Sequence, residues 1–480
     1  MSVSAPSRCD PVARVASAAV GGPAGRRLAP SRGFWRALPV LVLLASLTMV
    51  GAVLTKQHCR AQGWSTPDQF WHACYSDIPV LYVSESLGTG ARPSVMDALG
   101  SEGLGQPPVA GAAMWVVSGI VDATSGARGQ FEVAVESRRF FDVSAGVLTA
   151  ALLAAVVAVA LAVGRRRRWD AAHLALSPVL LATALISYEL LAVALLAGAL
   201  WAWSRSRPVA AGVLLGLAVG SRPVVALVAV ALLGLSLRTG LWRVWARTAG
   251  VALVTWLAVR LILFPSPLQA LTDSWQAWKD STPGYGSLWL VPSLLAQSQP
   301  VSARFWYGGT GIGGPTSSMI TLLGLLIVAV ATVALALSTG YRARVAHLAL
   351  FAVAGGLLVV KSIPPQSGLL LLPLIALAGL RWRDHLIWAG AEIAYFIGVW
   401  LYIAASSDSA KGLPAGFYLV LILLRCGAIG WLAVQAVRAA RDPVLDPVRV
   451  PVDDAEGPTD ADDPAGGPLD RRPDALLIRT

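Results

Sequence analysis

The chain has 480 residues, of which 56% are hydrophobic and 14% are charged, and its formal net charge is +11. Soluble domains carry about a quarter charged residues, so this composition excludes an ordinary soluble domain and favours a membrane protein. The arginines stand at the ends of long apolar segments and are not gathered in one patch, so we expect no nucleic-acid partner.

Residues 1–33 are rich in Ala, Gly, Pro, Ser and Arg and have no periodic apolar pattern. We therefore expect a disordered cytoplasmic tail. An apolar segment follows from about Leu38 to Leu54. We interpret it as an uncleaved first helix and not as a signal peptide, because many apolar segments come after it.

Two of the four cysteines, Cys59 and Cys74, share the loop behind this helix. An extracellular loop would favour a disulfide between them, and the sequence leaves that pairing open. His58 and His72 flank the two cysteines. Their spacing matches no established zinc pattern, so we assign no metal ligands.

Basic clusters recur along the chain, and two apolar segments lie between each neighbouring pair. The clusters are Arg165–Arg168, Arg205 with Arg207, Arg238 to Arg247, Arg342 with Arg344, Arg381 with Arg383, and Arg438 with Arg441. By the positive-inside rule each cluster is cytoplasmic and each intervening turn is outside. The expected spans are 144–163, 171–187, 189–204, 208–220, 222–238, 248–264, 318–338, 345–360, 368–380, 385–404 and 414–437.

With the first helix, these segments predict an all-α polytopic membrane protein of about 12 transmembrane helices over residues 34–440. Both termini are then cytoplasmic, and two large loops, about 55–143 and 265–316, face outward. The run Pro108–Val121 is too short to span comfortably, so we expect a helix at the outer interface. Residues 441–480 are rich in Asp, Pro and Gly and predict a disordered cytoplasmic end.

Ionisable side chains at membrane depth are costly unless they line a wet cavity or have a partner. Five polar segments are therefore candidate sites, and all of them lie at the outer ends of spans or in outer loops. They are Tyr75-Ser76-Asp77, Ser187-Tyr188-Glu189, Ser221-Arg222-Pro223, Lys279-Asp280 with Tyr285 to Trp289, and Lys361 to Gln366. Each alone is also typical of an interfacial turn. Glu392 and Arg425 lie within the last two spans, where we expect a structural ion pair.

These residue types suit sugar transfer at a membrane surface. A carboxylate between aromatic and apolar residues, such as Asp77, can serve as a general base because burial raises its pKa. Cations such as Arg222, Lys279 and Lys361 suit a phosphate group, and aromatic faces suit sugar rings. The alternatives are a helix-capping Asp77 and aromatic side chains that only anchor the interface.

At these residues the chain resembles the family 87 glycosyltransferases of actinobacteria, multi-spanning enzymes of the GT-C superfamily. The resemblance covers roughly residues 35–450. It is carried by Cys74-Tyr75-Ser76-Asp77-Ile78-Pro79, Arg139-Phe140-Phe141-Asp142-Val143, Trp169-Asp170-Ala171-Ala172 with Leu176-Ser177-Pro178, Tyr285-Gly286-Ser287-Leu288-Trp289, Glu392, Trp400 and Arg425.

The resemblance implies a GT-C-like bundle that transfers a hexosyl group, mannosyl in the first place, from a polyprenyl-phosphate sugar to a lipid-linked or cell-envelope glycan. It implies Asp77 as the base and a juxtamembrane helix at Pro108–Val121. Glu189 is expected to be a supporting acid. The expected substrate-binding residues are Tyr75, Ser76, Arg222, Lys279, Asp280, Tyr285, Trp289, Lys361 and Gln366. Membrane lipids and other cell-envelope synthesis proteins are expected partners in the plasma membrane.

Two other functions stay open. One is a transporter or flippase for lipid-linked glycans, against which stand the lack of two-half symmetry and the few charges near the midplane. The other is a non-catalytic partner of the same fold, because family motifs are altered at Ser187-Tyr188-Glu189 and at Ser221-Arg222-Pro223. No cofactor is fixed by the sequence, and a divalent cation is left open.

Overall fold

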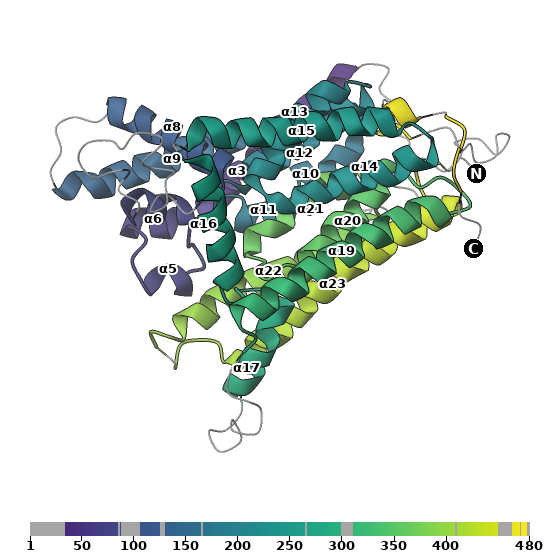
Figure 1. The fold of residues 1–480 in the computed structure, drawn as a ribbon. Helices are drawn as coiled ribbons and strands as arrows, with labels where there is room; N and C mark the ends of the chain where they lie inside the picture. Colours follow the sequence, from purple (N-terminus) through teal and green to yellow (C-terminus); the bar gives the residue numbers. More distant parts are fainter. Residues whose placement is uncertain are drawn as a thin grey trace, which may run out of the picture.

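The structure is a computed structural model that describes residues 34–84, 87, 106–124, 130–164, 167–264, 266–298, 311–408, 410–449, 463–470 and 472–477. The predicted N-terminal tail, residues 1–33, lies outside the described residues. Every regular element within these ranges is a helix (Figure 1), as the apolar pattern predicts.

Among the described residues, six helices are long and apolar enough to cross a membrane. They are α3 (Phe34–Thr55), α9 (Gln130–Ala162), α15 (Trp242–Leu263), α19 (Gly314–Ser338), α22 (Trp382–Ala404) and α23 (Ala415–Arg441). Large apolar side chains stay exposed on them, for example Leu47 on α3, Ile262 on α15 and Ile327 on α19. Such exposure is expected of surfaces that face lipid.

Six further passes are short or broken. They are α10 (Ala172–Ala175) with α11 (Pro178–Thr183), α12 (Glu189–Ser204), α13 (Pro208–Ser221), η2 (Pro223–Ala226) with α14 (Leu227–Arg238), α20 (Val345–Val359), and η4 (Pro365–Leu370) with α21 (Leu371–Ala378). Together with the six long helices, these shorter elements are consistent with the predicted polytopic membrane bundle. The 16 residues of α12 reach about 24 Å, less than the hydrocarbon thickness of about 30 Å. Short passes bring polar turns into the depth of the bundle.

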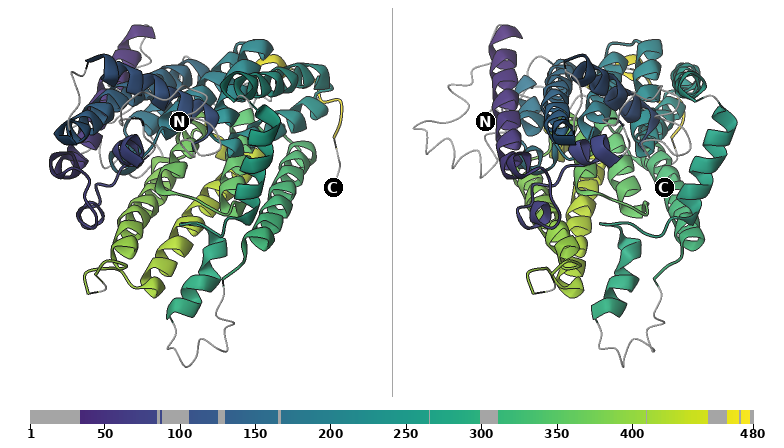
Figure 2. Two further views of the ribbon diagram at one scale, coloured as in Figure 1. Left: turned by 60° about the vertical axis from the view of Figure 1, so that its left-hand side comes forward. Right: turned by 90° about the vertical axis from the view of Figure 1, so that its left-hand side faces the viewer.

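The passes alternate between two ends of the bundle. The Asp77 end is the end at which α3 ends, α12 begins and α6 (Asp77–Ser84) lies. The tail end is the opposite one, at which α9 and α23 end. Figure 2 shows from two further directions that α22 and α23, drawn in yellow-green, lie side by side between these ends.

The two long connections expected outside the membrane are themselves helical at the Asp77 end. The first holds α4 (Gln57–Gln62), α5 (Asp68–Trp71), α6 and α8 (Pro108–Thr124), and the second holds α16 (Pro267–Asp280), η3 (Leu288–Leu290) and α17 (Val291–Ser298). Figure 1 shows α16 running across the direction of α15 and α19. The helix predicted at Pro108–Val121 is present as α8. A Cβ atom on Gly220 of α13 would lie 2.8 Å from Val109 Cγ2, so α8 packs closely on the end of α13.

The C-terminal residues correct one prediction. We expected disorder from residue 441 onward, but the described segments include η5 (Pro443–Leu445) and η6 (Gly467–Leu469) and pack on the tail end (Figure 1, yellow). The Asp474 carboxylate lies 2.7 Å from the Arg238 guanidinium, and the Val345 amide donates to Asp463 at 2.9 Å. The physical reason is charge pairing, because the tail's carboxylates neutralise arginines at the helix ends.

Asp446 makes the most buried of these contacts. Its two carboxylate oxygens accept hydrogen bonds from Arg344 at 2.7 and 3.0 Å, and both side chains are buried. Burial alone would raise the pKa of Asp446, but the Arg344 charge outweighs it and the pKa falls to about 2. The ionised carboxylate therefore stabilises the folded chain.

We expect Asp446→Asn to lower stability by about 3–5 kcal/mol, because it leaves the Arg344 charge buried and unpaired. The folded-state pKa lies below the ordinary value, so the wild-type advantage should be complete above about pH 4 and shrink as the pH falls towards 2. Thermal unfolding of the detergent-solubilised protein, followed by tryptophan fluorescence, measures this. Asp442→Asn, an exposed change nearby, is the control. An Asp446→Asn variant as stable as the wild type at pH 7 would contradict the assignment.

Candidate functional site

Asp77 is the first residue of α6 and is fixed to the turn that precedes α12. Its backbone amide donates to the Ile186 carbonyl at 2.8 Å, and the Ser76 hydroxyl donates to the Leu185 carbonyl at 2.7 Å. Cys59 and Cys74 form a disulfide with Cα atoms 5.7 Å apart, which confirms the pairing that the sequence left open. The segment that carries Asp77 is therefore tied both to α4 and to the interior of the bundle.

The Arg139–Val143 motif on α9 supports this connection. Asp142 accepts hydrogen bonds from Arg60 of α4 at 2.8 and 2.6 Å. Phe141 packs on Trp64 with ring centroids 5.1 Å apart, and Phe140 packs on Tyr82 of α6 at 4.7 Å. This motif positions the Asp77 segment and does not itself present a reactive group.

Lys56 is a buried cation beside Asp77 that was not among the residues predicted from the sequence. Its side chain is 1% exposed, and its ammonium group donates to the Tyr75 carbonyl at 3.0 Å and lies 5.1 Å from the Phe396 ring centroid. Burial lowers the pKa of Lys56 to about 7, and the Asp77 charge opposes that change. The sequence signal that could have revealed Lys56 is its position directly after the apolar run of α3.

The Asp77 carboxyl is half-buried, and burial raises its pKa above the ordinary value. The Tyr75 hydroxyl and the charges of Arg222 and Lys56 oppose this rise. Asp77, Lys56 and Arg222 therefore act on one another electrostatically, although they come from three different parts of the chain. A carboxyl with a raised pKa between two cations is suited to accepting a proton from a substrate hydroxyl.

Glu189 and Arg222 form an ion pair between the first residue of α12 and the turn after α13. The Glu189 side chain is completely buried, whereas that of Arg222 is 26% exposed. One Glu189 oxygen, Oε1, has no hydrogen-bond partner among the described residues. Arg222 is thus held by its Nε atom, and its other guanidinium nitrogens have no hydrogen-bond partner among the described residues.

Aromatic rings line one side of Tyr75. The ring centroids of Tyr75 and Trp400 lie 4.6 Å apart, and Phe70 stacks on both at 5.5 and 5.9 Å. This cluster of Phe70, Tyr75 and Trp400 joins α5 to α22 next to Asp77. Flat rings in this position offer an apolar surface for the face of a sugar or for the first units of a polyprenyl chain.

The segment Gly284–Trp289 pairs with the loop that follows α20. The Gly284 amide donates to the Lys361 carbonyl at 2.7 Å, and the Ile363 amide donates to the Tyr285 carbonyl at 3.1 Å. Gly286 has φ +79° and sits against Ile363, so no other residue fits there without strain. Trp289 donates from its indole to the Val359 carbonyl at 2.9 Å, whereas the Tyr285 ring is exposed.

The ammonium group of Lys361 forms hydrogen bonds with the protein itself. Its ammonium group donates to the Trp278 carbonyl, to the Ser281 carbonyl at 2.9 Å and to the Ser318 hydroxyl at 2.7 Å. The first two are at the C-terminal end of α16, where a cation is favourable. Burial lowers the pKa of Lys361, opposed by the charge of Asp280. We infer that Lys361 fastens α16 to α19, which leaves its donors occupied.

The ion pair predicted between the last two spans is present. Arg425 donates to Glu392 at 2.8 Å, and both side chains are fully buried. Arg425 also donates to the carbonyls of Ile363 and Pro364, the latter at 3.1 Å. The pair therefore holds the loop after α20 in place, in agreement with a structural role.

The structure thus gathers some of the predicted site residues and separates others. Asp77, Tyr75, Ser76, Glu189 and Arg222 lie together, with Lys56 added. Gln366 is buried at the start of η4, and its Oε1 atom lacks a hydrogen-bond partner among the described residues. Lys279 and Asp280 are exposed at the end of α16, and no contact joins them to this cluster among the described residues.

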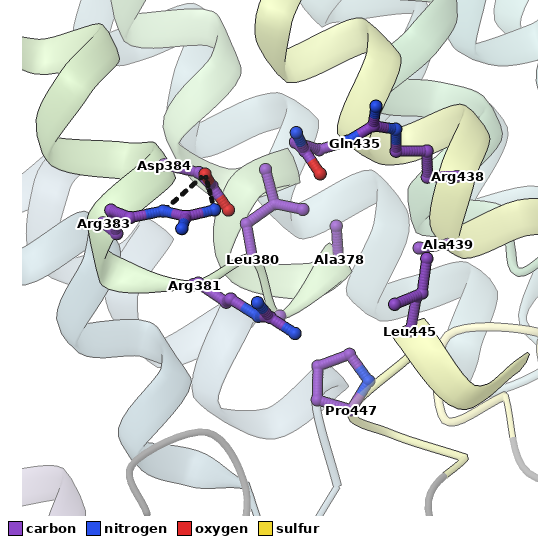
Figure 3. A pocket seen from close by; sticks show the side chains of 11 residues that line it. Ala378, Leu380, Arg381, Arg383, Asp384, Gln435, Arg438, Ala439, Leu445 and Pro447 are labelled. Atoms are coloured by element: carbon purple, nitrogen blue, oxygen red, sulfur yellow. Dashed lines mark hydrogen bonds and ion pairs between the residues drawn. The ribbon is translucent and has the colours of Figure 1, made fainter. Parts of the chain in front are cut away.

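A cavity of about 140 Å³ lies at the tail end and not beside Asp77. Figure 3 shows the side chains of Arg381, Arg383 and Arg438 around it, at the start of α22 and the end of α23. Arg383 contacts Asp384 at 3.3 Å. These arginines belong to the clusters that the positive-inside pattern identified, so the cavity is distinct from the candidate site.

The comparison with known protein families covers part of the Asp77 cluster. Residues 138–362 match the family model of glycosyltransferase family 87. No curated protein matches the chain. The family match confirms the resemblance predicted from the sequence, and it includes Glu189, Arg222 and Lys361. Lys56 and Asp77 precede the matched residues, so their assignment depends on the geometry described above.

We expect Lys361→Met to loosen α16, because two hydrogen bonds to its C-terminal end and one to Ser318 of α19 are lost. Hydrogen exchange of residues 267–281 should rise at least about tenfold, since local opening would cost roughly 1.4 kcal/mol less. Lys411→Met, a change of an exposed lysine at the same end, should leave that exchange unaltered. Wild-type exchange in Lys361→Met, together with weaker donor binding, would instead assign Lys361 to the substrate.

Proposed function

We propose that this family 87 glycosyltransferase transfers a hexosyl group, mannosyl in the first place, from a polyprenyl-phosphate sugar to a lipid-linked or cell-envelope glycan acceptor. The observation that carries the proposal is the cluster of Asp77, Lys56, Arg222 and Glu189. It combines a half-buried carboxyl with a partly exposed guanidinium at the end of short helices. A phosphosugar with a long lipid tail needs such a polar site beside apolar surface.

In the proposed reaction the acceptor hydroxyl attacks the anomeric carbon and Asp77 takes the hydroxyl proton. The new carbon–oxygen bond forms as the bond from the anomeric carbon to the phosphate oxygen breaks, and the configuration at that carbon inverts. The polyprenyl phosphate leaves with the electron pair. Arg222 stabilises the charge that develops on the phosphate, as a fixed cation does in a site that is poor in water.

Two residues support these roles without reacting. Glu189 holds Arg222 through its Nε atom and so turns the other guanidinium nitrogens towards the donor phosphate. Lys56 lowers the pKa of Asp77 and so keeps a larger fraction of the carboxylate ionised and able to act as the base. Gln366, Tyr75 and Ser76 complete the proposed substrate-binding set.

We further propose that the Asp77 end faces the outside of the plasma membrane and the tail end faces the cytoplasm. The arginine clusters at the tail end support this orientation by the positive-inside rule. The disulfide supports it as well, because disulfides persist in oxidising surroundings. The proposed partners are the polyprenyl-phosphate sugar, membrane lipids, the acceptor glycan and other cell-envelope synthesis proteins.

One experiment tests the activity. Membranes that contain the protein are supplied with radiolabelled polyprenyl-phosphate mannose, and lipid and polymer fractions are assayed for label. Transfer to either fraction supports a glycosyltransferase. Label that crosses the membrane on an unchanged lipid would assign the protein to transport, and no transfer under conditions in which the donor binds would assign it a non-catalytic role.

We expect Asp77→Asn to abolish transfer, by about 10²–10⁴-fold, because the amide cannot accept the proton. The variant should keep its disulfide and its thermal stability, since the Asp77 backbone contacts remain. The rate of label transfer measures the effect. Asp408→Asn, a change of an exposed carboxylate at the same end, is the control. Full activity in Asp77→Asn would show that another group is the base.

We expect Lys56→Met to move the acidic limb of the kcat/KM profile to higher pH. Loss of the cation raises the pKa of Asp77, so the base becomes protonated at a higher pH than in the wild type. On the acidic side, activity at a fixed pH should fall by up to about tenfold if the limb moves by a full pH unit, and it should recover as the pH rises. Lys411→Met should leave the profile unchanged. An unmoved acidic limb in Lys56→Met would rule out this electrostatic link.

A further inference from the structure

A group of potential metal ligands lies outside the proposed catalytic cluster, in the connection between α3 and α6. His58 Nε2 lies 2.7 Å from Asp68 Oδ2, and His72 Nδ1 lies 3.1 Å from Asp68 Oδ1. One ligand atom from each of the three residues lies within 4.8 Å of the others. The two imidazole rings stack with centroids 3.7 Å apart.

The local fold brings these three side chains together. His58 is the second residue of α4, next to Cys59, and His72 directly follows α5, two residues before Cys74. The disulfide between the buried cysteines therefore holds the two histidines close to each other. Asp68 begins α5 and stands four residues before His72, so both side chains lie on one face of that turn.

We propose that His58, Asp68 and His72 bind one divalent transition metal ion of the zinc class. Two imidazole nitrogens and one carboxylate oxygen form the type of three-residue ligand set that zinc accepts, with a fourth position left for water. Calcium and magnesium prefer sets made of oxygen atoms, which this site does not offer.

The distances need only a small adjustment. Ligand atoms around tetrahedral zinc lie about 3.4 Å apart, because each is about 2.0–2.2 Å from the metal. The two carboxylate contacts at 2.7 and 3.1 Å must therefore widen by about 0.7 and 0.3 Å, and any ligand pair near the 4.8 Å limit must narrow. The side chains of His58 and His72 are 40% and 48% exposed, which leaves them room to turn.

The bound metal would act as a second cross-link beside the disulfide. Phe70 follows Asp68 on α5 and stacks on Tyr75 and Trp400, the rings next to Asp77. Fixing Asp68 to His58 and His72 therefore restricts the movement of the aromatic cluster. This positioning role requires no contact between the metal and the transferred sugar, so the proposal stands independently of the transfer activity.

Zinc binding to the full-length protein in detergent, purified through a tag that contains no histidine, tests the site. We expect one zinc ion per chain after desalting and a rise in unfolding temperature with added zinc, because a ligand that binds the folded state stabilises it. His72→Ala and Asp68→Asn should each weaken binding by at least about tenfold and remove the temperature rise. Gln57→Ala, an exposed change on α4, should bind zinc like the wild type.

The disulfide and the elution volume of each variant show whether it is folded. Because the ligand side chains are partly exposed, both should match the wild type. Cobalt(II) gives a second readout, since a tetrahedral nitrogen and oxygen set produces visible absorption bands that the double variant His58→Ala/His72→Ala should lack. A wild-type protein that binds no zinc, or a double variant that binds it equally well, would overturn the proposal and leave only a hydrogen-bonded triad.

Discussion

The need to neutralise buried cations governs this fold. An unpaired charge in an apolar bundle costs several kcal/mol, so each buried cation must find oxygen atoms nearby. The pairings are Lys56 with the Tyr75 carbonyl, Arg238 with Thr339 and Asp474, Arg344 with Asp446, Lys361 with the end of α16, and Arg425 with Glu392 and the loop after α20. Each pairing joins elements that are distant in the sequence, and in this way the charges determine how the passes are arranged.

Arg222 differs from these cations in a way that matters for function. Glu189 engages only its Nε atom, and the side chain keeps partial exposure at the end of α13. The other cations named above direct most of their donors at oxygen atoms of the protein, although Arg238 Nε has no partner among the described residues. A partly exposed cation at the end of a short helix suits an anionic lipid headgroup. The donor site is therefore proposed at the Asp77 end of the bundle, where the charge of Arg222 is only partly neutralised.

Much of this arrangement could be predicted from the sequence, because the arginine clusters and apolar runs report directly on the number and direction of passes. The Glu392–Arg425 pair followed from charges within two neighbouring spans. The role of Lys361 could not be predicted, because the sequence around a lysine that follows a span is the same whether its ammonium group binds a substrate or the end of a helix. The docking of Asp446 and Asp474 was missed since their composition resembles that of disordered segments. Lys56 was missed for a similar reason, as one lysine at a span end is ordinary.

The residues that match the family model contain only part of the candidate site. Residues 138–362 include Glu189 and Arg222, which under the proposed function hold the donor phosphate. Asp77 and Lys56 lie before them, on a connection fixed by the Cys59–Cys74 disulfide and by the Arg60–Asp142 pair. Under the proposed function, Asp77 must therefore be positioned against the donor by contacts between two parts of the chain, chiefly the Asp77–Ile186 and Ser76–Leu185 hydrogen bonds. Loosening the connection would move the base while leaving the donor in place, so the rigidity of residues 56–77 is itself a condition for transfer.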